Sequence, residues 1–139
     1  MITKLKHVSL FVLDQKSAYD FYVNKLGFKV NTDAEMGAKG RWLTVNPPEQ
    51  PEIELTLIAI DDKMMFDKES AETMRGLVRA GTFGIAAFEC DDMLATFEEL
   101  KAKGVHFKKE PTNEFYGFSA VFEDDSGNWF SLSEKEKAK

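Results

Sequence analysis

Few residues of this chain carry side chains that commonly do chemistry, and two of them fall in strand-like segments. The 139 residues include two histidines, His7 and His106, and one cysteine, Cys90. A histidine beside a carboxylate can orient it as a general base or a counter-ion. Glu54, in a second strand-like segment, is the carboxylate that we single out. The same two residues, His7 and Glu54, could instead form a hydrogen-bonded polar pair in a cavity wall, and the sequence leaves both interpretations open.

Both residues lie in segments whose side chains alternate between two faces. Residues 5–13 place Val8, Leu10 and Val12 on one face and His7, Ser9 and Phe11 on the other. Residues 52–59 place Ile53, Leu55 and Leu57 opposite Glu52, Glu54 and Thr56. Successive side chains of a strand point to opposite sides of a sheet. We therefore expect the apolar faces to pack under helices and the polar faces to line an open surface.

The elements that position these residues occur twice, because the chain repeats itself at a shift of 77 residues. The shift places Gly104 on Gly27 and Gly117 on Gly40, and we find no need for a gap. In the first copy the pattern predicts a strand, a helix at 15–26, and strands at 28–35, 40–46 and 52–59. In the second it predicts a helix ending at Gly104, then strands at 105–110, 117–123 and 129–134. The fold class is therefore α+β, with two tandem βαβββ modules.

The predicted organisation is a single domain over residues 1–139. Module one covers residues 1–60, a connector helix lies within 61–81, module two covers 82–134, and 135–139 form a short tail. The apolar spacing of residues 71–78, a capping Asp67 and a terminal Gly81 indicate the connector helix.

Composition narrows the function classes. Hydrophobic residues make up 43% and charged residues 30% of the chain, as in a globular protein. The apolar stretches are too short to span a membrane, and no signal peptide is recognisable, so a cytoplasmic protein is expected. A net charge of −6 without a basic cluster argues against nucleic-acid binding, which requires a basic face.

Short sequence motifs point to a known family. The run from His7 to Asp14 (HVSLFVLD), the segment AYDFY from Ala18 and KLGF from Lys25 resemble the first strand and helix of the vicinal-oxygen-chelate (VOC; glyoxalase/bleomycin-resistance) superfamily. The run from Gly117 to Asn128 (GFSAVFEDDSGN) is similar to a further motif of that family. The resemblance implies a curled mixed sheet with a central cleft. It also implies a homodimer, because members commonly pair their modules across subunits.

The resemblance further implies where a metal would bind. Metal-binding members carry a ligand on the first and on the last strand of each module, which corresponds to His7 and Glu54 in module one. The shift of 77 puts the module-two positions at Gly84 and Ser131, which are poor ligands. A catalytic divalent ion normally has three or more protein ligands, and His106 is interpreted as a surface or ladder residue. We expect no cofactor; Zn, Ni, Mn or Fe would find at most a weak two-ligand site.

Three functions remain open. The favoured one is a small-molecule-binding protein of the glyoxalase/bleomycin-resistance type, with a degenerate metal site, that sequesters an organic ligand. The cleft is expected to present Ser9, Phe11, Trp42, Phe88, Trp129 and Ser131 beside His7 and Glu54. One alternative is a metal-dependent lyase or isomerase of glyoxalase I type with Glu54 and His7 as catalytic residues; a dioxygenase is disfavoured because it needs two histidines and a carboxylate. The other is a non-catalytic interaction or regulatory module.

Overall fold

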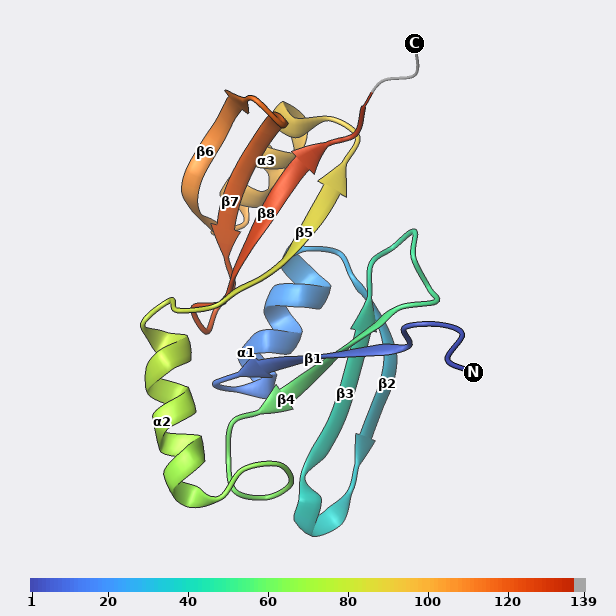
Figure 1. Cartoon of the computed structure of the whole chain (residues 1–139), viewed down its shortest axis with the longest axis vertical. Helices are drawn as coiled ribbons and strands as arrows, with labels where there is room; N and C mark the ends of the chain where they lie inside the picture. The colour runs from blue at the N-terminus through green and yellow to red at the C-terminus, as the bar shows by residue number, and fades with distance from the viewer. Residues whose placement is uncertain (137–139) are drawn as a thin grey trace.

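The computed structural model describes residues 1–136 and consists of two βαβββ modules joined by a helix (Figure 1). Module one contains β1 (His7–Val12), α1 (Gln15–Tyr19), the π-helical turn η1 (Asp20–Lys25), β2 (Lys29–Glu35), the 3-10 turn η2 (Gly37–Lys39), β3 (Arg41–Asn46) and β4 (Glu54–Ala59). The connector is α2 (Lys68–Arg79). Module two contains β5 (Gly84–Cys90), α3 (Met93–Ala102), β6 (His106–Glu114), β7 (Gly117–Glu123) and β8 (Trp129–Glu134). Of the predicted tail, residues 137–139 lie outside the described residues.

Each module forms its own four-stranded mixed sheet. The strand orders are β1-β4-β3-β2 and β5-β8-β7-β6, so the two sheets have the same topology. In each sheet the first and last strands of the module pair in parallel and the other neighbours pair antiparallel. The predicted α+β class and the doubled βαβββ unit are confirmed.

The helices begin at aspartates that cap free backbone N–H groups. Asp14 accepts a hydrogen bond from Ser17 N, and Asp92 accepts one from Ala95 N at the start of α3. The shift of 77 would have placed the second cap at Asp91. The cap lies one residue later because β5 carries a bulge between Gly84 and Ala86, which adds one residue to the strand.

The larger of two hydrophobic clusters in the described residues runs through both modules. It lies between the two sheets, on the side of each that carries its helix, and α1 lies between the sheets (Figure 1). Aromatic contacts cross from one module to the other: the ring centroids of Tyr22 and Phe130 lie 6.3 Å apart, and those of Phe28 and Phe88 lie 5.4 Å apart. Because the helix-bearing sides face each other, the opposite side of each sheet faces away from the other module. We call these two surfaces the open face of module one and the open face of module two.

The turn between β7 and β8 fastens module two to module one. Ser126 Oγ accepts a hydrogen bond of 2.9 Å from Leu13 N, and Asn128 Nδ2 donates one of 2.8 Å to Phe11 O. Gly127 has a φ of 118°, and a Cβ there would lie 2.3 Å from the carbonyl oxygen of Val78 in α2. Only glycine fits both the conformation and the contact, so the turn is held against the connector as well.

Within residues 1–136, no helix is long and apolar enough to cross a membrane.

Candidate functional site

The parallel pairing of β1 with β4 brings His7 and Glu54 together on the open face of module one. They are directly paired in the sheet, and His7 Nε2 lies 3.3 Å from Glu54 Oε2. The Glu54 side chain is 13% exposed, whereas that of His7 is 36% exposed. The sequence-based expectation that these two side chains share a face is confirmed in position, and the carboxylate is the more deeply seated of the two.

Buried hydroxyl groups orient this pair. Thr44 Oγ1 donates a hydrogen bond of 2.8 Å to Glu54 Oε1, and Thr44 Oγ1 in turn accepts 3.1 Å from Thr32 N. Thr56 Oγ1 lies 3.3 Å from His7 Nδ1. Both threonines are almost completely buried. The carboxylate is therefore held in one orientation before any ligand arrives, and it can accept a hydrogen bond or a proton, or attract a cation.

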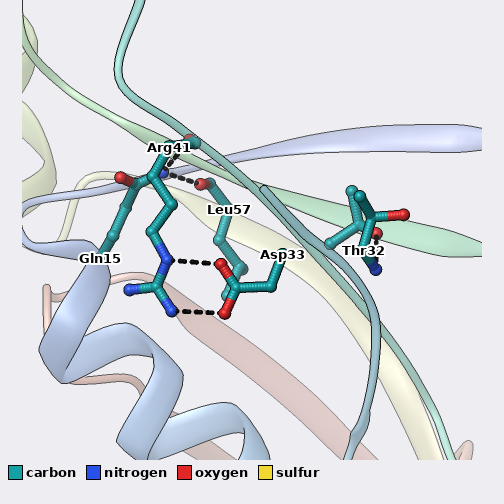
Figure 2. A network of polar contacts seen from close by, with 6 residues as sticks. Gln15, Thr32, Asp33, Arg41 and Leu57 are labelled. Carbon is teal, nitrogen blue, oxygen red and sulfur yellow. Dashed lines mark hydrogen bonds and ion pairs between the residues drawn. The ribbon is translucent and has the colours of Figure 1, made fainter. Parts of the chain in front are cut away.

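A pocket of about 170 Å³ lies where β3 and β4 separate, and it is lined by Trp42 and Thr56, which neighbour this pair, but not by His7 or Glu54. The two strands pair only at Thr44 with Thr56 and at Val45 with Leu55. Beyond that point Gln15 bridges them, because its Nε2 donates 2.8 Å to Arg41 O and 2.9 Å to Leu57 O (Figure 2). The lining includes Gln15, Arg41, Trp42, Thr56, Ile58 and Met64.

Trp42 connects the pocket to the His7–Glu54 pair. It lines the pocket, and its ring centroid lies 6.3 Å from that of His7. The sequence predicts Trp42 beside His7 and Glu54, and this contact agrees with that expectation. A half-buried indole beside a small pocket and a fixed carboxylate gives the mixed apolar and polar surface that small-molecule sites commonly have.

Arg41, at the edge of the pocket, is already paired with a carboxylate. Its Nε and Nη2 donate 2.8 Å hydrogen bonds to the two oxygens of Asp33, as Figure 2 shows. Its guanidinium also lies 5.4 Å from the ring centroid of Tyr19. Hydrogen bonds from Arg41 lower the pKa of Asp33, so the pair stays ionised. Arg41 thus shapes the pocket wall and is not a free cation for a ligand.

The open face of module two carries different residues at the equivalent positions. Gly84 pairs with Trp129 where module one pairs His7 with Glu54. The prediction that Ser131 corresponds to Glu54 is therefore wrong. The connection before the last strand has seven residues in module one (47–53) and five in module two (124–128), so the shift for this strand is 75 residues. Ser131 still lies on the open face, opposite Ala87 and Val121.

Two residues expected in the cleft pack elsewhere. Phe88 lies on the helix side of its sheet, with ring centroids 5.0 Å from Phe130 and 5.4 Å from Phe28. The bulge after Gly84 reverses the alternation of β5 and turns Phe88 into the core. Phe11 packs against Phe66 at 5.3 Å, in the small cluster beneath α2. The connector thus covers the end of β1, so Phe11 is not a free cleft wall.

Further polar residues lie on the open faces, and one of them, Glu123, went unrecognised in the sequence. Ser9, which was predicted, is exposed on β1 opposite Thr56. His106, interpreted as a surface or ladder residue, is 69% exposed but lies 2.7 Å from Glu123 Oε1. Glu123 pairs with Trp129 across β7 and β8, so these side chains share one face. The signal that could have revealed Glu123 is its alternation with Val121 in β7.

The residues that a metal would require are incomplete. His7 and Glu54 are two donors in direct contact, and the equivalent module-two residues, Gly84 and Trp129, have no side-chain ligand. In the described part of the chain, no three His, Cys, Asp or Glu side chains are grouped so that they could hold a metal ion. The residues of a single chain therefore do not fit the divalent ion that the family implies.

The fold and the two open faces define a class: α+β proteins made of paired βαβββ modules. The profile of the Glyoxalase/Bleomycin resistance protein/Dioxygenase superfamily matches residues 4–132. The chain belongs to this superfamily, and the resemblance noted in the sequence is confirmed.

Individual relatives cover the chain almost completely. It is 33% identical over 134 residues to the uncharacterized protein YetH of Bacillus subtilis, which covers 96% of this chain and 100% of YetH. The crystal structure of UcmS2 is 43% identical, with a TM-score of 0.89, and the match covers 95% of this chain and 98% of UcmS2. TnmS3, an antibiotic-binding protein from Streptomyces sp. CB03234, is 29% identical with a TM-score of 0.74, covering 97% and 98% of the two chains.

Proposed function

We propose that this protein binds and sequesters a small organic ligand on its open faces, with Glu54 as the polar anchor. The observation that carries the proposal is the fixed carboxylate: Thr44 donates 2.8 Å to one oxygen and His7 lies 3.3 Å from the other. Trp42, whose ring centroid lies 6.3 Å from that of His7, supplies an apolar surface and also lines the pocket of about 170 Å³. The similarity to an antibiotic-binding protein supports this choice of function.

We infer that the complete cleft forms in a homodimer. In one chain the two open faces point away from each other, because the core lies between the helix-bearing sides. A second copy related by a two-fold axis could place its module-two open face against the module-one open face of the first. Such an arrangement is closed and creates two identical clefts. We further propose a cytoplasmic location, which agrees with a chain whose lone cysteine has no intramolecular partner.

The test of the proposed anchor is a thermal-shift screen of small cations, thiol conjugates and aromatic antibiotics, followed by calorimetric titration of each hit. Glu54→Gln should weaken cationic or hydrogen-bond-donating hits by about 1–3 kcal/mol, the range for losing a charge-assisted hydrogen bond. Glu52→Gln is the matched control, because Glu52 is exposed two residues earlier. Hits that bind Glu54→Gln as tightly as the wild type would show that Glu54 is not the anchor.

A second candidate is a lyase or isomerase in which Glu54 acts as general base. The direct contact between His7 Nε2 and Glu54 Oε2 at 3.3 Å favours it, because the imidazole would orient the carboxylate toward a substrate proton. The test is turnover of a hemithioacetal, with and without added Zn, Ni, Mn or Fe. Turnover that Glu54→Gln abolishes would replace the sequestering function with this one. A stable protein partner combined with no ligand at all would instead favour an interaction module.

A further inference from the structure

The indole of Trp129 lies across the backbone of Gly84. A Cβ at Gly84 would lie 2.3 Å from Cη2, 2.4 Å from Cζ2 and 2.7 Å from Cζ3 of that indole. Three neighbouring ring atoms at such similar distances mean that the six-membered ring presents its face, not its edge, to Gly84. Any other residue at position 84 would displace the ring.

The contact, rather than the backbone conformation, is what requires glycine at position 84. Gly84 is not among the glycines with positive φ. Other L-residues could therefore adopt its backbone conformation, and only the indole excludes them. The sequence repeat places Gly84 at the position of His7, and the strand pairing places Trp129 at the position of Glu54. Module two thus has an indole ring lying on a glycine where module one has a histidine–carboxylate pair.

One face of the Trp129 indole is uncovered, and the residues around it are acidic. Trp129 is partly exposed and Gly84 is exposed, and Trp129 alternates with the core residue Phe130, so its side chain lies on the open face of module two. In the described part of the chain, no other aromatic ring and no cation stacks on the indole. Glu123 is its direct neighbour in β7, and Glu89 lies farther along β5 on the same face.

We propose that Trp129, laid on Gly84 beside Glu123, is a stacking platform for a planar organic cation. An indole face attracts cations through its quadrupole and stacks with flat rings. The Glu123 carboxylate, which His106 also contacts at 2.7 Å, adds attraction for positive charge, and the net charge of −6 acts in the same direction. The inference rests on the proposed small-molecule binding and adds the class of ligand and the residues that select it. Gly84 is a positioning residue, because it acts only through the indole.

The test uses the full-length protein and two probes of nearly the same shape. The permanently charged probe is 1-methylquinolinium, and the neutral one is quinoline at pH 8. The chain has two tryptophans, so a ¹⁵N-labelled sample gives two indole N–H signals, and Trp129→Phe identifies the one from Trp129. We expect 1-methylquinolinium to shift the Trp129 signal in a saturable way, and quinoline to bind more weakly. The absence of saturation at millimolar probe, or equal affinity for both probes, would overturn the proposal.

Variants separate the platform from a general apolar surface. Trp129→Leu and Gly84→Ala should each weaken the binding of 1-methylquinolinium by about 2- to 30-fold, the range of a cation–π contact. Trp129→Phe should weaken its binding less. Gly76→Ala is the matched control, because a Cβ at Gly76 in α2 meets nothing within 4 Å. Unchanged thermal melting of Trp129→Phe shows that the fold is intact even where Gly84→Ala is unstable.

The outcomes also distinguish this inference from the proposed function. Some ligands could bind Glu54→Gln more weakly than the wild type but bind Trp129→Leu with wild-type affinity. That result would leave the proposed function standing and remove the platform. Binding of 1-methylquinolinium that depends on Trp129 but not on Glu54 would keep the platform and remove the proposed anchor.

Discussion

The hydroxyl of Tyr22 donates a hydrogen bond of 2.7 Å to Oδ2 of Asp124, and both residues are buried. This contact joins η1 of module one to the turn between β7 and β8. The other oxygen of Asp124 accepts three backbone N–H groups at 2.9 Å, from Ser126, Gly127 and Asn128. Burial and the neighbouring Asp124 raise the pKa of Tyr22 well above its usual value, so the hydroxyl remains a donor. The bond is one of the contacts that join the two modules.

The first prediction concerns this bond. Tyr22→Phe removes one donor from a buried carboxylate and should lower the free energy of unfolding by about 1–3 kcal/mol, because Asp124 loses a partner that water cannot replace. Urea denaturation followed by circular dichroism measures the change. Tyr19→Phe is the control, since the Tyr19 hydroxyl makes no hydrogen bond within residues 1–136. Equal stability of the two variants would show that the bond does not secure the module junction.

The second prediction concerns pH. Partial desolvation, with Asp124 nearby, raises the pKa of Asp125 to about 6, and Ser17 donates a hydrogen bond to its carboxylate. The folded state then holds this proton more tightly than the unfolded chain, so the contribution of Asp125 to stability is largest below pH 4 and declines as pH rises through 6. The stability of Asp125→Asn relative to that of the wild type should therefore increase between pH 4 and 7.

The size of that gain should be modest. Asp125 is exposed as a residue, and solvent screening should keep the gain at or below about 1 kcal/mol. Urea denaturation at pH 4, 5.5 and 7 measures it, with Asp62→Asn on an exposed turn as the control. A difference between Asp125→Asn and the wild type that stays constant with pH would contradict the assigned titration.

The sequence predicted the modules because their signal is long and repeated. Alternation in β1 and β4 also placed His7 and Glu54 correctly, each opposite the apolar face of its strand, and the parallel pairing of the two strands sets them side by side. The register between strands that are far apart in the sequence was harder to predict. A connection shorter by two residues moved the last strand of module two, so the counterpart of Glu54 is Trp129 and not Ser131.

The remaining errors came from irregularities that leave little trace in a single sequence. A bulge adds one residue to β5 and reverses the face of every later side chain in that strand, which turned Phe88 inward. Phe11 follows the alternation of β1, but Phe66 in the loop before α2 packs on it. That tertiary contact cannot be derived from the periodicity of either segment.

The third prediction tests the corrected position of Phe88. Its ring lies among Phe28, Phe122 and Phe130. Phe88→Ala should cost about 3–5 kcal/mol of folding free energy, the usual range for an aromatic core residue. Ser131→Ala, on the open face of the same module, should change stability by less than about 0.5 kcal/mol. Chemical denaturation measures both, and a small loss for Phe88→Ala would return this residue to the cleft.

The fourth prediction concerns metal. Two donors, His7 and Glu54, without contributions from Gly84 and Trp129, should hold Zn, Ni, Mn or Fe weakly. Elemental analysis of protein purified without chelator should find far less than one metal ion per chain, and added Zn²⁺ should leave thermal melting unchanged. Trp129→Glu, which supplies a carboxylate at the position equivalent to Glu54, is the informative variant. Near-stoichiometric metal in the wild type would contradict the prediction.

The last prediction tests the proposed dimer and its shared cleft together. Light scattering should give twice the mass of one 15.8 kDa chain.

Two chains with different tags, one with Glu54→Gln and one with Trp129→Leu, are then co-expressed and the mixed dimer is isolated through both tags. If each cleft combines module one of one subunit with module two of the other, one cleft of the mixed dimer receives both substitutions and the second receives neither. Titration with a ligand sensitive to both substitutions should then recover wild-type affinity at half of the sites, whereas each variant alone binds weakly. If each cleft belongs to one chain, every site in the mixture carries one substitution and no wild-type affinity returns. A single-chain mass, or the absence of recovered sites, would show that the open faces act separately.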